Sequence, residues 1–431
     1  MATPPHKLFK NALKMHTARD FKAAADLYQK IIRGDPGHID ALYMFGTLKA
    51  EQGDLAAAHE LLMQAAALAP HSPMIQNNLG NVYLKSERLD EAAICYQRAL
   101  QYNPNMHETH FNLASICLRQ EKFAEAAQGF EMAITLKPDF FRAHLYLGNL
   151  HKTLGNHPKA IHSYRKAMEL EQSSAEALYG LANALALHQE YAEAATCFRR
   201  LLELHPDDES TKFALAALQG QTPETAPRGY VSSIFDEMAE SFDTHLTQLG
   251  YRIPEMLRDM MINIAGADAR FKNCIDLGCG TGMSGAAFKP YTARISGVDL
   301  SSKMIVAARN KAIYDALFEE DLVEHLSRND ELFDLVLATD VFIYVGELRS
   351  LFAAVKQRMM AGGYLLFSTE RSDDAEYVLR PSGRYAHSPA YIESLAAEFG
   401  FAITYTSPAK IRMEKGVPEM GDIFALRRNG N

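Results

Sequence analysis

The chain has 431 residues, 48% of them hydrophobic, and a formal net charge of -9. This length predicts two or three domains, and the acidic balance argues against a nucleic-acid backbone as the main partner. The 5 cysteines are scattered without a C-x-x-C pair, so neither a metal site nor a disulfide framework is expected, and a cytoplasmic location is the simplest. Residues 1–19 lack an apolar core of the signal-peptide type, and no run of about 18 apolar residues predicts a membrane span.

The first half of the chain repeats itself every 34 residues. Each unit has an end position that lies two residues before its last residue. Twelve residues before that position stands an alanine, and eight before it there is usually an aromatic residue. Such a pattern predicts two helices that cross closely at the small residue, with the aromatic ring filling the space beside it. Proline then ends the second helix. The end positions are Pro36, Pro70, Pro104, Pro138, Gln172 and Pro206.

This pattern resembles the tetratricopeptide repeat, a helix pair of that period. The resemblance implies an α-solenoid, because one unit cannot bury its own apolar face and must stack on its neighbours. A capping helix is expected from Asp208 to Gln219, closed by Gly220. The array is therefore predicted over residues 5–219, with units at 5–38, 39–72, 73–106, 107–140, 141–174 and 175–208.

Asparagines recur on the first helix of successive units, which is expected to line the concave face of the array. Their amides can bind the backbone of an extended peptide as donor and acceptor, so a protein or peptide partner is one interpretation. The other is that small polar residues simply fit where the inner helices pack. The two rows comprise Asn81, Asn149 and Asn183, with Thr47 and Ser115, and beside them Asn78 and Asn112.

Residues 220–229 (GQTPETAPRG) have the composition of a linker. We expect few contacts there and independent folding of the two halves. The next segment, Tyr230 to Leu249, is predicted to be an amphipathic helix with Phe235, Met238 and Phe242 on one side.

A strand, a glycine-rich turn and a helix are predicted around Cys274-Ile-Asp-Leu-Gly-Cys-Gly-Thr-Gly282. Glycines at alternate positions let the backbone approach a nucleotide-like ligand closely. Asp276, two residues before the first glycine, would repel a pyrophosphate. It suits a ligand with an ammonium group and no phosphate, and S-adenosyl-L-methionine fits that description. The glycines are Gly278, Gly280 and Gly282.

A second acid, Asp299, ends the next predicted strand, where a carboxylate can bind both hydroxyls of a ribose. Together these motifs resemble the class I S-adenosylmethionine-dependent methyltransferases. The resemblance implies an α/β domain with a seven-stranded, Rossmann-like sheet over residues 230–431. It assigns cofactor contacts to Asp276, Gly278, Cys279, Gly280, Gly282, Asp299, Leu300 and Met304.

Two later turns complete the cofactor site implied by the resemblance. Asp321 would accept a hydrogen bond from the adenine amine and Leu322 would supply a main-chain amide, although a solvated acidic loop is the alternative. Asp340 and Tyr344 follow the strand Phe333–Thr339 and are placed where cofactor and acceptor meet. The string IFDEMAESFD is similar to the lid of quinone-precursor and biotin-pathway methyltransferases, although an ordinary packing helix also accounts for it.

The stretch Tyr377 to His387 is predicted to be irregular and to contact the acceptor. Arg384 and Tyr385 are the candidate acceptor-binding residues. His387 and Tyr344 are the candidate catalytic residues, since a histidine near its ordinary pKa can take a proton at neutral pH. A purely structural histidine is the alternative.

The combination resembles a bacterial group of predicted methyltransferases that carry tetratricopeptide repeats, including the strings LGYRIPEML and RYAHSPAY. Two hypotheses stay open for the methyl acceptor. Either the array captures a protein that the enzyme methylates, or the enzyme methylates a small molecule, such as an aromatic or quinone precursor, and the array docks it to a complex.

Overall fold

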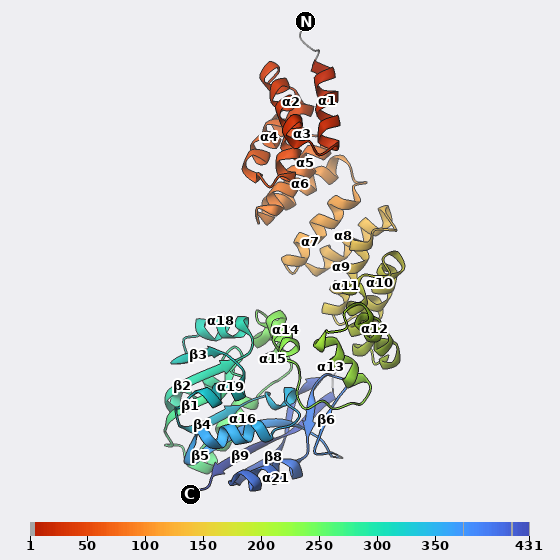
Figure 1. Ribbon diagram of the computed structural model, residues 1–431. Coiled ribbons are helices and arrows are strands. Elements are labelled where there is room, and N and C mark those ends of the chain that lie inside the picture. The colour runs from red at the N-terminus through yellow and green to blue at the C-terminus, as the bar shows by residue number, and fades with distance from the viewer. Residues whose placement is uncertain (1–4, 374, 415–416, 431) are drawn as a thin grey trace. The chain divides into compact units, whose positions relative to one another are not determined.

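Figure 1 shows the computed structural model, which describes residues 5–373, 375–414 and 417–430. The chain divides into two compact units, Met1–Ala184 and Leu185–Asn431. The first is built from helices, and the second contains helices and one mixed sheet.

The helices of the first unit keep the predicted period. Each 34-residue repeat contains two helices. The first helices of successive repeats begin 34 residues apart from Ile39 to Ala175, and the second helices do so from Phe21 to His157. The helices are α1 (Pro5–Thr17), α2 (Phe21–Gly34), α3 (Ile39–Glu51), α4 (Leu55–Leu68), α5 (Pro73–Lys85), α6 (Leu89–Tyr102), α7 (His107–Arg119), α8 (Phe123–Leu136), α9 (Phe141–Thr153), α10 (His157–Leu170) and α11 (Ala175–Leu187).

Small residues allow the paired helices to cross, as the sequence predicts. A Cβ atom at Gly80 would lie 2.7 Å from the ring of Tyr96, and one at Gly148 would lie 2.8 Å from the ring of Tyr164. Both tyrosines are fully buried. Glycine is thus required at these crossings because the aromatic ring occupies the space that a side chain would take.

The second unit opens with α12 (Tyr191–Leu204) and α13 (Glu209–Leu218). Asp208 caps α13 by accepting hydrogen bonds from the main-chain N–H groups of Ser210 and Thr211, at 3.1 and 3.3 Å. The predicted capping helix is therefore present. Its Phe213 packs against the rings of Tyr230 and Tyr385, with centroids 4.8 and 6.1 Å apart.

A sheet forms the core of the second unit. Its strands β3, β2, β1, β4 and β5 lie in this order and are parallel, and β9 pairs antiparallel with both β5 and β8. At the carboxyl end of β5, β7 pairs parallel with β5 and antiparallel with β6. The strands are β1 (Phe271–Leu277), β2 (Thr292–Asp299), β3 (Ala316–Glu319), β4 (Phe333–Ala338), β5 (Met359–Arg371), β6 (Tyr377–Leu379), β7 (Tyr385–His387), β8 (Phe401–Glu414) and β9 (Val417–Arg428). The last two strands, β8 and β9, pair antiparallel along most of their length. The stretch predicted as irregular instead contains β6 and β7.

Helices cover both faces of this sheet. Alternate residues of β1 point to opposite sides: Ile275 packs with α20 and α21, whereas Cys274 packs with α16. The helices are α14 (Arg228–Met238), α15 (Phe242–Gln248), α16 (Ile253–Ala265), α17 (Met283–Phe288), α18 (Ser302–Asn310), α19 (Leu322–Arg328), α20 (Arg349–Arg358) and α21 (Pro389–Phe399). No helix in the described part of the chain is long and apolar enough to cross a membrane.

Residues 222–226, which we call the strap, bind the loop after β4 and strand β7. The carbonyl of Glu224 accepts from the N–H groups of Gly346 and Glu347, at 2.9 and 2.7 Å, and the N–H of Ala226 donates to Tyr344 O at 3.1 Å. The expectation that the linker makes few contacts is therefore wrong for the strap, because its polar main-chain groups are paired across the sheet end. The domain limits at 219/220 and 229/230 stay predictions.

Candidate active site

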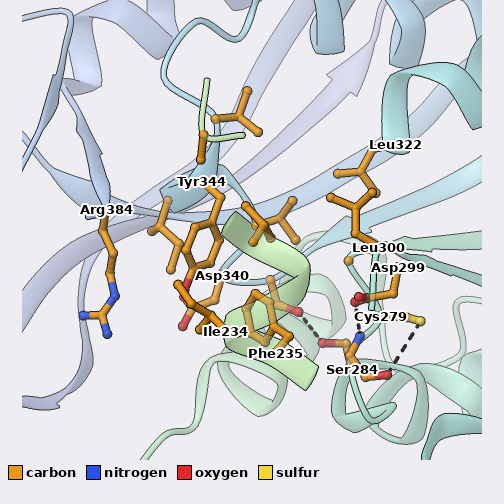
Figure 2. A pocket seen from close by; sticks show the side chains of 18 of the residues that line it. Ile234, Phe235, Cys279, Ser284, Asp299, Leu300, Leu322, Asp340, Tyr344 and Arg384 are labelled. Atoms are coloured by element: carbon orange, nitrogen blue, oxygen red, sulfur yellow. Dashed lines mark hydrogen bonds between the residues drawn. The ribbon is translucent and has the colours of Figure 1, made fainter. Parts of the chain in front are cut away.

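A cavity of about 500 Å³ opens at the carboxyl ends of β1, β2 and β4 (Figure 2). Its wall is formed by the glycine-rich turn, the ends of these strands, helices α14 and α15, and the strap. This is the edge of a parallel sheet at which ligands bind in open α/β folds.

The glycine-rich turn leaves no room for a side chain at Gly278 and Gly282. Gly278 has φ +68° and a Cβ atom there would lie 2.4 Å from the side chain of Val341. Gly282 has φ +96° and faces the ring of Tyr314. The turn therefore forms the narrow cradle predicted for a nucleoside-like ligand. Gly278, Cys279 and Gly280 line the cavity, whereas Gly282 lies behind its wall.

Asp276 is completely buried beneath this turn and does not line the cavity. Its Oδ2 atom accepts a hydrogen bond of 2.6 Å from the hydroxyl of Tyr314. Within the described residues its Oδ1 atom has no partner. Burial raises the pKa of this carboxyl to about 7. Sequence reasoning did not single out Tyr314, which follows α18.

Asp299 stands at the end of β2 and lines the cavity together with Leu300. Its carboxylate accepts from the main-chain N–H groups of Gly280 at 2.8 Å and Ser301 at 2.9 Å. Burial raises the pKa of this carboxyl, and the amide hydrogen bonds oppose that rise. Met304, which was expected to contact the cofactor, is instead fully buried and lies outside the lining.

Asp321 and Leu322 line the end of the cavity beyond β3. Asp321 caps α19, because its Oδ1 atom accepts from the N–H groups of Val323 and Glu324 at 3.0 and 3.1 Å. Its Oδ2 atom lies 3.5 Å from Nε of Arg228. The carboxylate is therefore partly engaged by the protein, and the assignment of both residues to the adenine remains a prediction.

Helices α14 and α15 cover the cavity with Ile234, Phe235, Met238 and Phe242. Figure 2 shows Ile234 and Phe235 beside Tyr344. The predicted lid segment thus lies over the site, as two helices instead of one.

Two aspartates hold this lid against the sheet. Asp236 accepts from the hydroxyl of Ser301 at 2.5 Å. Asp243 accepts from the hydroxyl of Thr281 in the glycine-rich turn and from the ammonium group of Lys311. Sequence reasoning missed both contacts, because they join segments far apart in the chain.

Asp340 lies at the floor of the cavity with φ +53°, a strained value for a residue other than glycine. Its carboxylate accepts from the hydroxyl of Ser368 at 3.2 Å and from Nη1 of Arg412 at 3.4 Å. Arg412 also binds Glu370, a carboxylate buried in β5. Sequence reasoning did not single out Arg412, Ser368 or Glu370, which lie on β8 and β5.

Tyr344 and Arg384 line the cavity as predicted, on the side away from Asp299 and Cys279 (Figure 2). Burial raises the pKa of the Tyr344 hydroxyl, and the positive charges of Arg384 and Arg412 oppose that rise. The phenol therefore stays protonated at neutral pH and acts as a hydrogen-bond donor.

His387 is not placed to act as a general base, so this prediction is wrong. The side chain is 1% exposed and lies outside the cavity lining. Its Nε2 atom donates to the carbonyl oxygens of Val345 and Gly346, both at 3.0 Å. Burial lowers the pKa of the imidazole to about 4, so it is neutral at pH 7.

Tyr385 is likewise a structural residue and not an acceptor contact. It is fully buried outside the cavity lining, and its hydroxyl donates to the carbonyl of Pro223. Both residues were misassigned because the loop that carries them forms a strand, whose side chains point into the apolar cluster beneath the strap.

The asparagines of the array are half-buried and bind one another and their neighbours. The amide of Asn112 donates to Oδ1 of Asn81 at 3.1 Å, and that of Asn78 donates to Thr47 at 2.9 Å. Oδ1 of Asn149 accepts from the hydroxyl of Tyr164 at 2.6 Å. These contacts favour the packing interpretation, although a role in peptide binding, also for half-buried Asn183, remains a prediction.

Known families match both parts of the chain. Residues 275–367 match the model of the methyltransferase domain. Residues 43–101, 77–141 and 145–209 match that of the tetratricopeptide repeat.

Curated relatives are similar to the second half. A ubiquinone biosynthesis O-methyltransferase of Thiobacillus denitrificans is 26% identical over 185 residues, which are 36% of this chain and 78% of that protein. A malonyl-[acyl-carrier protein] O-methyltransferase of Hamiltonella defensa is 26% identical over 149 residues, 34% of this chain and 54% of that one. Among solved structures, the crystal structure of MamA is 25% identical, with a TM-score of 0.36 over 38% of this chain and 96% of that one.

The sheet order, the glycine cradle and the buried acids define a class I S-adenosylmethionine-dependent methyltransferase domain, in agreement with the family match. The cradle at Gly278 and the carboxylate of Asp299 in the cavity lining suit this cofactor. The chain joins that enzyme domain to an amino-terminal region of tetratricopeptide repeats.

Proposed function

We propose that the chain methylates an oxygen of an acceptor that enters the lidded cavity, and that its repeat array binds a protein or peptide. One observation carries the first part. A single cavity is lined by two groups of residues. Asp299 and the glycine-rich turn form the side that we assign to the nucleoside of the cofactor, and Tyr344 and Arg384 form the side that we assign to the acceptor.

The residues of the cavity divide into three roles in this proposal. Asp299 holds the ribose hydroxyls, and Leu300 and Leu322 contact the adenine. Asp276, expected at the ammonium end, lies beneath the turn and supports it through its hydrogen bond from Tyr314. S-adenosylmethionine, when bound, supplies an electrophilic methyl group. The lid excludes water, so that the acceptor meets the methyl group in a fixed orientation.

Two sources of the acceptor fit this arrangement. The first is a protein held by the array, whose side chain enters the cavity. The second is a small molecule, with the array acting as a docking module. The printed names of the curated relatives favour the second, since most are ubiquinone biosynthesis O-methyltransferases. The cavity volume also lies within the usual range for small-ligand sites, about 300–1,000 Å³.

The test is methyl transfer from S-adenosylmethionine carrying a tritiated methyl group into an extract of the source cells, with the full chain added. We expect label in the extract with the wild-type chain and about the background level with Asp299→Ala. Precipitation separates label on protein from label on small molecules and so distinguishes the two sources. Equal counts with both chains would contradict the proposed enzyme activity.

A further inference from the structure

Phenol and guanidinium groups, which donate hydrogen bonds, form part of the otherwise mostly apolar cavity wall. They belong to Tyr251, Tyr344, Arg384 and Arg412, which we call the donor cluster. Its two guanidinium groups lie close together, since Arg384 is 3.9 Å from Glu370 and Arg412 binds the same carboxylate. Burial keeps both phenols protonated. Guanidinium groups donate and never accept.

The carboxylates of this cluster are turned toward protein partners. Asp340 accepts from Ser368 and Arg412. Glu370 lies outside the lining and pairs with Arg412, with Arg380 and, at 3.9 Å, with Arg384. Their oxygens therefore do not supply the acceptor side with free negative charge.

Arg412 retains donor capacity beyond these two carboxylates. It is 5% exposed, and its Nε–H group has no acceptor among the described residues. A buried guanidinium with an unpaired donor is costly unless a further acceptor lies nearby. Arg412, which lines the cavity, therefore has one N–H group that neither Asp340 nor Glu370 satisfies.

Two other acids, Glu224 and Glu347, line the cavity at the strap. Glu347 is engaged there, since its Oε1 atom accepts from the hydroxyl of Tyr391 at 3.1 Å and from the N–H of Arg349 at 2.9 Å.

We propose, on the basis of the methyltransferase function above, that this donor cluster binds a carboxylate and that the enzyme converts it into a methyl ester. A carboxylate is an acceptor-only group, and its two oxygens match the two parallel N–H groups of a guanidinium. Arg384 and Tyr344 orient the carboxylate, with Arg412 and Tyr251 behind them.

The chemistry needs no base. A carboxylate is ionised at neutral pH, so one of its oxygens attacks the methyl carbon directly. A C–O bond forms as the S–CH₃ bond breaks, and the electron pair of that bond stays on sulfur, which becomes a neutral thioether. No proton moves. The ester is neutral and loses its charge-assisted hydrogen bonds to Arg384, which favours release of the product.

Methyl esters differ from methyl ethers and methylamines in their lability to alkali. We therefore suggest treating the tritium-labelled extract with alkali and measuring volatile methanol separately for the protein pellet and the small-molecule fraction. The proposal predicts that most of the label is released as methanol. Release from the pellet identifies a protein side chain or terminus, and release from the soluble fraction identifies a small acid.

Matched substitutions test the site. Arg384→Lys keeps the charge but loses the paired N–H groups, so KM for the acceptor should rise at least about tenfold. Arg380→Lys is the control, because Arg380 lies in the same loop and also binds Glu370 but does not line the cavity. Tyr344→Phe should raise KM about fivefold. Affinity for S-adenosylhomocysteine should stay unchanged in all three.

The outcomes separate the two proposals. Label that resists alkali overturns the carboxylate acceptor while the methyltransferase function stands. Label that is alkali-labile but insensitive to Arg384→Lys overturns the assignment of the subsite. Absence of any label above the Asp299→Ala background overturns the proposed function and the carboxylate with it.

Discussion

Tyr385 donates its hydroxyl hydrogen to the main-chain oxygen of Pro223 at 2.9 Å, and so ties the strap to strand β7. The same ring packs against Phe213 of α13. Ala226 and Val231 complete this buried cluster. The strap and the capping helix therefore belong structurally to the methyltransferase sheet, even though the repeat pattern assigns α13 to the array.

We predict that a fragment that starts at Arg228 is less stable than one that starts at Tyr191. The shorter fragment loses Phe213 and the strap, which exposes Tyr385 and leaves the N–H groups of Gly346 and Glu347 without their acceptor. The melting temperature followed by circular dichroism should be at least about 5 °C lower. Equal melting temperatures and equal cofactor affinity would instead support a domain that begins at residue 230.

Replacement of Asp299 by alanine should weaken binding of S-adenosylmethionine roughly ten- to a thousand-fold. Each charge-assisted hydrogen bond to the ribose is worth about 1.5–3 kcal/mol. Isothermal calorimetry measures the effect, with Asp259→Ala as the control because Asp259 is an exposed acid on α16. An unchanged affinity for Asp299→Ala would show that this strand end does not hold the ribose.

Removal of the Asp243 carboxylate should loosen the lid. Asp243 binds Thr281 of the glycine-rich turn and Lys311, so Asp243→Ala breaks the links between α15 and the cavity wall. Dissociation of the cofactor, measured by stopped-flow fluorescence of a labelled analogue, should become about tenfold faster. Glu240→Ala, at an exposed position between α14 and α15, is the matched control. Identical rates for the two variants would contradict a lid function.

The burial of His387 predicts a dependence of stability on pH. Its folded pKa of about 4 lies below the unfolded value of about 6.5, so the unfolded chain binds more protons between these values. This contribution is fully present above about pH 6.5 and is lost as pH falls toward 4. Between pH 7 and 5 the wild-type chain should lose about 2 kcal/mol more than His387→Gln, measured by denaturant unfolding. Equal losses would show that this imidazole titrates normally.

The hydrogen bond between Tyr164 and Asn149 predicts a structural role for the asparagine row. Asn149→Ala leaves a buried phenol without its acceptor, which should cost about 1–3 kcal/mol. The change should be small in a Tyr164→Phe background, where no hydroxyl is left unpaired. Hydrogen exchange of α9 and α10 in the full chain provides the measurement. Equal effects in both backgrounds would favour a groove function over packing.

Features that depend on near neighbours could be predicted from the sequence. The helix pairs begin at the residues that the 34-residue period indicates, because small and aromatic positions encode the crossing within each unit. The cradle at Gly278 and the acid at Asp299 were also predictable, since each sits at the end of a recognisable strand.

Features that join distant segments were decided only by the tertiary structure. Arg412 reaches Asp340 across 72 residues, and Thr225 of the strap meets Tyr344 across 119. No local pattern marks such partners, because strand order determines which side chains meet at one end of the sheet. The role of His387 was also decided by the tertiary structure, because the sequence alone allowed this residue to act as a base at neutral pH. Burial beneath the loop after β4 makes it a neutral donor instead, since desolvation disfavours the charged imidazole.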